Sequence, residues 1–246
     1  MSTHIFIYGD SHTQALLNAT KAPDFISGDV KFDIHWMLSQ KKEGKTLGDL
    51  SIEKAVEVVN TLKGNDLLVI SLLGTAHNII GLLQHSNPYR LVDEFALSNI
   101  LESRFCMIPR NAMLDMFDEW CRKNKRIQKL TSNASVRSLH LMTPPPKEDN
   151  DFIESKISSY RNKYISDFGI ADPQLRLSLW KLEMEALSEV CAEWHIGIVP
   201  PPPEAITERG FLKKEFYGGD ATHANLLYGG LVLKQLEKLT HNAQVY

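Results

Sequence analysis

Short apolar runs alternate with longer amphipathic stretches along this chain, and that alternation limits the possible folds more than any other feature. Five runs have the aliphatic and aromatic composition of buried strands: residues 4–9, 31–37, 66–73, 136–142 and 195–200. Apolar residues recur at helical spacing in four other stretches: 50–62, 111–126, 174–194 and 225–239. Strands that alternate with helices predict an α/β fold, in which a parallel sheet is covered on both faces.

The length of the chain bounds its domain organisation. A chain of 246 residues can bury one large core, so we expect a single domain over residues 1–246. The segment from about residue 85 to 134 is long for one connection between strands. We therefore expect it to be a long insertion between the third and fourth strands, where it would contribute to specificity.

Charge and composition argue against several classes of partner. The net charge is −3, which gives no global field to recruit nucleic acid or an acidic membrane surface. The sequence has no run of about 18 apolar residues and no signal-peptide pattern, so we expect a cytoplasmic protein without membrane contact. Three widely spaced cysteines (Cys106, Cys121 and Cys191) predict reduced thiols.

Metal and cofactor motifs are missing from the sequence. The nine histidines include no pair with a carboxylate at metal-binding spacing. Glycine patterns of phosphate loops and dinucleotide sites are also absent. We expect no metal and no cofactor.

The stretch "IFIYGDSHT" ends its strand on glycine, aspartate and a serine, Ser11. In open parallel sheets, ligands bind in the crevice beyond the carboxyl ends of the strands. A helical pattern follows Ser11, so its backbone amide would lie at a helix N-terminus, where the dipole favours a developing negative charge. An ordinary helix cap at Asp10-Ser11 is the alternative interpretation.

A serine nucleophile needs a base, and the base needs a partner that orients it. Asp220 and His223 are three residues apart, so one loop could aim both side chains at Ser11. Alternatively, Asp220 could cap the last helix and leave His223 in solvent.

Taken in order along the chain, these motifs resemble the SGNH (GDSL-type) hydrolase superfamily. The resemblance rests on "GDS" at 9–11, a glycine loop at "EGKTLGDL", "LLGTAHN" at 72–78 and Asp-x-x-His at 220–223. It implies a three-layer α/β/α sandwich with a five-stranded parallel sheet of the flavodoxin-like type. It further implies Ser11 as nucleophile, His223 as base and Asp220 as its partner. The amides of Ser11 and Gly44 would form part of the oxyanion hole, with Gly48 as the alternative glycine.

The third motif departs from the Gly-x-Asn pattern of that superfamily, whose asparagine donates to the oxyanion. Here the asparagine, Asn78, stands four residues after the glycine rather than two. We expect Asn78 to supply the side-chain donor, with His77 or Thr75 as alternatives, while a helix cap at Asn78 is the competing interpretation. His12 replaces the commoner leucine of "GDSL", and we expect it on an exposed first helical turn.

The sequence thus predicts a serine esterase that hydrolyses small O-acyl esters, with carbohydrate carriers favoured by the resemblance. Its partner would be a small-molecule or glycan ester. Two other functions remain open: an O-acyltransferase that uses the same three residues, and a ligand-binding module of the same fold without turnover.

Overall fold

The fold is described from a computed structural model, which covers residues 3–23, 25–40, 46–92, 105–157 and 168–241. Gly44 lies outside the described residues, as does the part of the expected insertion at 93–104.

Five parallel strands form the central sheet, and they are the five that the sequence predicts. In spatial order these are β2 (Val30–Trp36), β1 (Thr3–Gly9), β5 (Leu67–Ser71), β8 (Arg137–Leu141) and β9 (Gly197–Val199). Every neighbouring pair runs parallel. Numbered among themselves, the strands have the order 2-1-3-4-5, which is the doubly wound order of flavodoxin-like folds.

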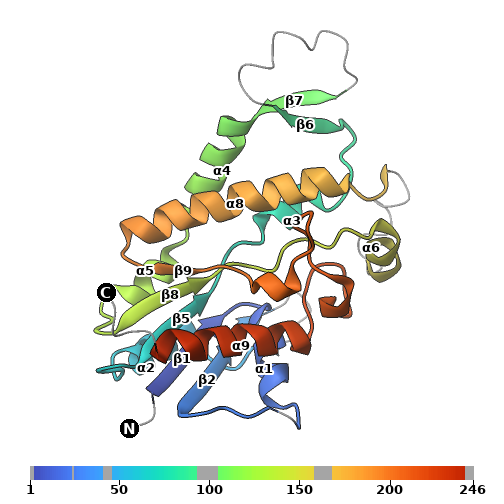
Figure 1. The fold of residues 1–246 in the computed structure, drawn as a ribbon. Helices are drawn as coiled ribbons and strands as arrows, with labels where there is room; N and C mark the ends of the chain where they lie inside the picture. Colours follow the sequence, from blue (N-terminus) through green and yellow to red (C-terminus); the bar gives the residue numbers. More distant parts are fainter. Residues whose placement is uncertain (1–2, 24, 41–45, 93–104, 158–167, 242–246) are drawn as a thin grey trace.

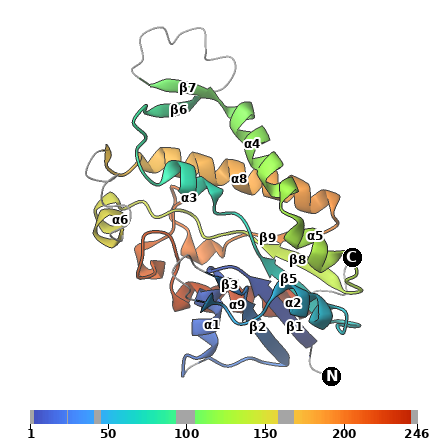
Figure 2. The ribbon, with the colours of Figure 1, turned by 180° about the vertical axis from the view of Figure 1, so that it is seen from behind.

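Helices cover both faces of this sheet. On one face lie α1 (Thr13–Thr20) and α9 (Leu226–His241), seen in front of the strands in Figure 1. The other face carries α2 (Ile52–Val59), α5 (Lys125–Thr131) and α8 (Pro173–Glu193), and Figure 2 shows α2 and α5 from that side. The predicted three-layer α/β/α sandwich is confirmed.

Strand β1 shows how the sequence builds the two cores. Successive side chains of a strand point to opposite faces. Ile5 and Ile7 therefore pack with α1 and α9, while Phe6 and Tyr8 pack with the helices of the other layer. All four side chains are fully buried, because β1 pairs with β2 and β5 on its two sides and is covered by helices on both faces.

The connection between β5 and β8 carries several elements of its own. They are α3 (Ala76–Gly81), β6 (Tyr89–Val92), β7 (Cys106–Pro109), α4 (Arg110–Lys123) and α5. Strands β6 and β7 pair with each other, away from the central sheet (Figure 1). The sequence pattern predicts one helix over 111–126, but α4 ends at Lys123 because Asn124 takes an extended conformation and its side chain caps α5.

The remaining elements are short. The strands β3 (Ser39–Gln40) and β4 (Thr46–Leu47) follow β2 and pair antiparallel, and α6 (Asn150–Lys156) follows β8. The long segment between β9 and α9 contains two 3-10 turns, η2 (Pro203–Ala205) and η3 (Lys214–Phe216).

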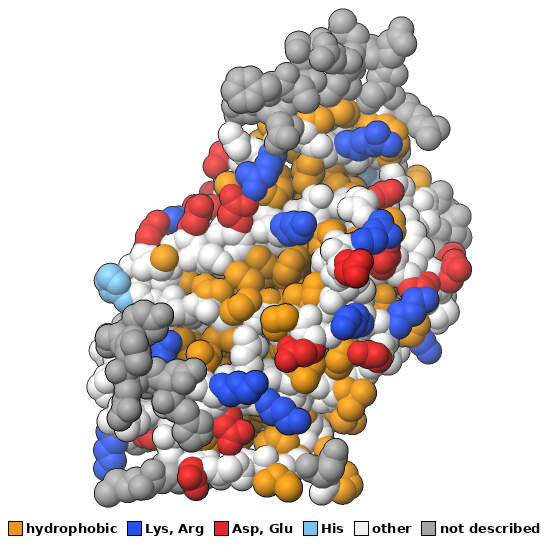
Figure 3. All heavy atoms as spheres, in the orientation of Figure 1, with side chains coloured by type: hydrophobic (Ala, Val, Ile, Leu, Met, Phe, Trp, Pro, Cys, Tyr) orange, Lys and Arg blue, Asp and Glu red, His pale blue; other side chains and the backbone are white. Residues whose placement is uncertain are grey.

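Hydrophobic side chains gather over the band between α8 and α9 in Figure 3. Among the described residues, no helix combines the length and apolarity needed to span a membrane.

Candidate active site

A glycine allows the turn that presents Ser11. A Cβ atom at Gly9 would lie 2.3 Å from the carbonyl oxygen of Ser71, so only glycine lets β1 end this close to β5. The amide of Asp10 donates to that same Ser71 oxygen at 2.9 Å, and the Thr13 hydroxyl donates to the Asp10 carbonyl at 2.6 Å. These bonds fix Ser11 between the end of β1 and the start of α1.

The irregular loop before α9 brings Asp220 and His223 to Ser11. Asp220 Oδ1 accepts hydrogen bonds from the amides of Thr222 and His223, both at 2.8 Å. Its other oxygen, Oδ2, lies 2.7 Å from His223 Nδ1. On the opposite side of the imidazole, Nε2 lies 2.7 Å from Ser11 Oγ. The structure therefore places all three residues in one hydrogen-bonded chain.

The alternative role of Asp220 as a helix cap is not found. Helix α9 begins at Leu226, and the side chain of Asn225 caps it by accepting from the amides of Leu227 and Tyr228 at 3.0 and 3.2 Å. The Asp220 side chain is hydrogen-bonded to His223 instead.

The environment keeps the Asp220 carboxylate ionised. Partial burial by itself would raise the pKa of this carboxyl, but the His223 side chain and the two loop amides outweigh burial and lower its pKa well below the usual range. An ionised partner favours the tautomer of His223 that carries its proton on Nδ1, which leaves Nε2 able to accept the proton of Ser11.

The backbone amide of Ser11 is free to bind a ligand. Its neighbours on both sides are engaged, because the Asp10 amide donates to Ser71 and the His12 amide to Asp10 Oδ1 at 3.2 Å. Ser11 N–H has no acceptor within the part of the chain that the structure describes. Gly48, the alternative to Gly44, has φ +83° and packs against the Met37 carbonyl, where a Cβ atom would come within 2.3 Å.

Asn78 lies near the site but not at a helix cap. Helix α3 begins two residues earlier, and the buried carboxylate of Glu183 accepts from the amides of Ala76 and His77 at 2.9 and 2.8 Å. The same carboxylate lies 2.7 Å from His77 Nδ1, so His77 is held on that side. Asn78 instead lines a small cavity together with His12 and Thr222.

The structure contradicts the predicted exposure of His12. Only 9% of its surface is exposed, and its ring packs on that of His223 with centroids 4.8 Å apart. Burial, with the nearby His223 and His77 rings, lowers the pKa of His12 to about 3 and keeps the imidazole neutral. The leucine that His12 replaces in the commoner motif was a signal in the sequence that this position faces inward.

Asp10 is a second residue of the turn whose environment sequence reasoning missed. Burial raises the pKa of this carboxyl to about 6, against the opposing effects of the His12 amide and the His223 ring. The turn that presents Ser11 thus contains a carboxyl group that resists ionisation.

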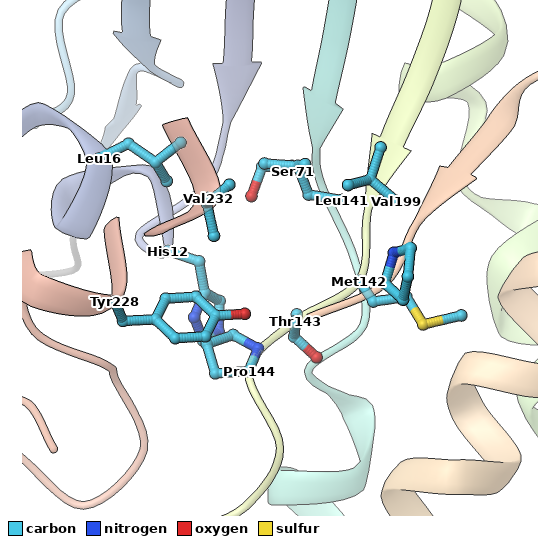
Figure 4. A pocket seen from close by; sticks show the side chains of 11 residues that line it. His12, Leu16, Ser71, Leu141, Met142, Thr143, Pro144, Val199, Tyr228 and Val232 are labelled. Atoms are coloured by element: carbon cyan, nitrogen blue, oxygen red, sulfur yellow. The ribbon is translucent and has the colours of Figure 1, made fainter. Parts of the chain in front are cut away.

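A polar cleft lies beside Ser11, and two smaller cavities adjoin His12. A cleft of about 270 Å³ borders Ser11 and His223, and the uncharged amides of Gln14, Asn18 and Asn225 contribute to its wall. The cavities beyond His12 are far smaller, at about 10 and 20 Å³. Figure 4 shows the larger of these two, between the start of α1, the loop after β8 and α9.

Comparison with known proteins finds similarity only among solved structures. No model of a protein family matches the chain, and no curated protein does. A GDSL-like lipase from Bacteroides thetaiotaomicron is 11% identical, with 98% of this chain and 89% of that chain covered and a TM-score of 0.48. A carbohydrate acetylesterase family member from Sinorhizobium meliloti is 11% identical, with 97% of each chain covered and a TM-score of 0.48.

A third structure, the periplasmic domain of a lipopolysaccharide acetyltransferase from Salmonella Paratyphi A, is 11% identical and has a TM-score of 0.46. The match covers 98% of this chain and 85% of that one. The first description names the superfamily that the sequence motifs resemble.

Proposed function

We propose that this protein is a serine esterase of the SGNH type that hydrolyses small O-acyl esters. One observation carries the proposal: Ser11 Oγ, His223 and Asp220 form a continuous hydrogen-bonded chain with two contacts of 2.7 Å. This is the arrangement in which a hydroxyl becomes a nucleophile, because the imidazole can accept its proton while the carboxylate stabilises the resulting imidazolium.

The first half of the reaction forms an acyl-enzyme. His223 Nε2 takes the proton of Ser11 as Oγ attacks the ester carbonyl. The free amide of Ser11 supports a role as oxyanion donor, and we assign the Asn78 side chain and the Gly44 amide as its partners. His223 then gives its proton to the alcohol oxygen, which leaves.

The second half of the reaction uses water. His223 removes a proton from a water molecule that attacks the acyl carbon, and collapse of the second tetrahedral intermediate returns the proton to Ser11. The polar cleft beside Ser11 gives water access to the acyl-enzyme and therefore favours hydrolysis over transfer.

The dimensions of the site favour a short acyl group. The small cavities adjoining His12 hold about one water molecule each, so neither accommodates a long acyl chain. The side-chain amides of Gln14 and Asn18 suit a neutral hydroxylic alcohol, such as a sugar, which they could bind through hydrogen bonds.

A labelling experiment and an ester panel test the proposal together. A fluorophosphonate should label Ser11 in the native protein, and Ser11→Ala should not be labelled. Among esters from acetyl to octanoyl, the shortest should have the highest kcat/KM. Transfer to an added alcohol at the expense of hydrolysis would indicate an acyltransferase, and failure of both labelling and hydrolysis would indicate a binding module.

A further inference from the structure

Within the described residues, no backbone amide donates to the carbonyl oxygens of Gly218 and Asp220 in the loop before α9. Residues 218–223 form neither helix nor strand, and the backbone bond from Gly218 N–H to the His223 carbonyl closes the loop at 2.8 Å. About half of the Asp220 side chain is exposed. Such a loop needs support from elsewhere to hold a carboxylate within the narrow limits that a catalytic hydrogen bond requires.

That support comes from a buried lysine after β8. Lys147 is only 2% exposed, and its ammonium group donates to the carbonyl oxygens of Gly218 and Asp220 at 3.2 and 2.5 Å. The rings of Phe152 and Tyr217 lie 4.7 and 5.0 Å from Nζ. A buried ammonium group is costly, so its place beneath this loop calls for a role beyond packing.

Helix α8 holds the backbone of this lysine. Arg176, which is also 2% exposed, donates from Nη2 to the carbonyls of Lys147 and Glu148 at 3.0 and 3.2 Å, and from Nη1 to the Ala171 carbonyl. The amide of Glu148 donates to the Tyr217 hydroxyl at 3.0 Å. Lys147 therefore reaches the loop from a fixed base.

We propose that Lys147 is a positioning residue, whose ammonium group clamps the Gly218 and Asp220 carbonyls and so holds the Asp220 carboxylate against His223. This inference rests on the proposed function of the site. No carboxylate forms an ion pair with Lys147 among the described residues, so the two carbonyls are its polar partners. The charge matters because hydrogen bonds from an ammonium group are roughly twice as strong as those from a neutral donor.

The groups around Lys147 set when it holds its proton. Burial lowers its pKa to about 8, the Asp220 carboxylate opposes that shift, and Lys156 on α6 adds to it. The Arg176 guanidinium approaches from α8, while Glu148 is paired with Arg209. We therefore expect the clamp to weaken as the pH rises above about 8.

The test compares Lys147→Met with Lys156→Met. Lys156 lies over the same Phe152 ring, at 5.7 Å, but it is exposed and has no bond to the loop. For Lys147→Met we expect kcat to fall by about tenfold or more with KM within about threefold of wild type, because the loss concerns the placement of reacting groups. The ring-nitrogen NMR resonances of His223 should also shift. Lys156→Met should change neither.

Retention of wild-type kcat and His223 resonances in a folded Lys147→Met protein would overturn the proposal. If that variant does not fold, a pH titration of the wild type decides. The Cε resonance of Lys147 reports loss of its proton, and the His223 ring resonances should move with the same midpoint. His223 resonances that stay constant through that midpoint would contradict the clamp. These NMR readouts need no turnover, so they separate failure of the clamp from failure of the esterase proposal.

Discussion

Replacement of Gly229 by alanine should move Ser11, which precedes α1, away from His223, which precedes α9. Gly229 lies in α9 where this helix crosses α1, and a Cβ atom there would be 2.2 Å from the carbonyl oxygen of Ala15 and 2.5 Å from its carbonyl carbon. An ordinary carbon–oxygen contact is about 3.3 Å or longer. Because the opposing atoms belong to the backbone, no side-chain rotation relieves the clash, and the helices must move apart by about 1 Å.

That movement acts directly on the reacting atoms. Helix α1 begins two residues after Ser11, and α9 begins three residues after His223. A displacement of about 1 Å would stretch the Ser11 Oγ to His223 Nε2 distance from 2.7 Å past the limit of a good hydrogen bond. Misplacement on this scale costs about 10² in rate. We therefore expect Gly229→Ala to lower kcat about a hundredfold.

The neighbouring glycine provides a matched control. A Cβ atom at Gly230 meets no atom within 4 Å, so Gly230→Ala gains helix propensity without a clash. It should raise the free energy of unfolding by about 0.5–1 kcal/mol, and hence Tm by about 1–4 °C, with kcat unchanged. At Gly229, overpacking should lower the free energy of unfolding by about 1–3 kcal/mol, and the gain in helix propensity should offset part of this loss.

Steady-state kinetics on an acetyl ester, fluorophosphonate labelling rates and thermal melts on both variants give the comparison. Gly229→Ala should lose labelling rate and kcat together while it remains folded. A folded Gly229→Ala protein with kcat within about threefold of wild type would refute the reasoning, because the helix crossing would then not set the position of Ser11 relative to His223.

Three further predictions concern single residues of the site. Ser11→Ala should retain the fold and lose more than about a hundredfold in hydrolysis; a larger residual rate would exclude Ser11 as the nucleophile. Asn78→Ala should lower kcat by about 10²–10³ with little change in KM, whereas Thr75→Val and His77→Ala should each lose less than about tenfold; a reversed ranking would move the donor role. Asp10→Asn should make the fold more stable than wild type at pH 7, by up to about 3 kcal/mol for a pKa raised by about 2 units to about 6. Wild-type stability falls as the pH rises through 6, so urea unfolding should show this advantage disappearing by about pH 4; an advantage that does not depend on pH would contradict the assignment.

The central sheet could be predicted from the sequence because its strands are buried on both faces. Such strands appear as continuous apolar runs, and β1 and β5 both have this character. The proximity of Ser11, Asp220 and His223 could be anticipated as well, because strand ends meet at one edge and three-residue spacing suits a loop that aims two side chains together.

Burial of polar residues could not be predicted in this way. Lys147 follows a proline run and Glu183 lies in a helix with many charged residues, so both resemble surface positions in the sequence. Their burial depends on partners far along the chain: Glu183 binds amides at the start of α3, and Lys147 binds carbonyls of the loop before α9. Local periodicity carries no information on such contacts.

The break between α4 and α5 shows a related limit. The apolar spacing continues through Asn124, but the side chain of that residue offers the backbone a local cap in place of the helix. The choice between a continuous helix and a break at Asn124 depends on the packing of α5 against α2. This contact cannot be inferred from the apolar pattern of a single segment.

The bond between Ser11 and His223 joins residues 212 positions apart. During synthesis on the ribosome, chains grow at about 5–20 residues per second, so Ser11 is synthesised at least about 10 s before His223. The nascent protein can pair its first strands during this interval, yet it lacks His223, the proposed base. The proposed hydrolysis therefore requires release of the loop and α9 from the ribosome, and a nascent chain stalled before that point should remain unlabelled by fluorophosphonate even where its sheet has formed.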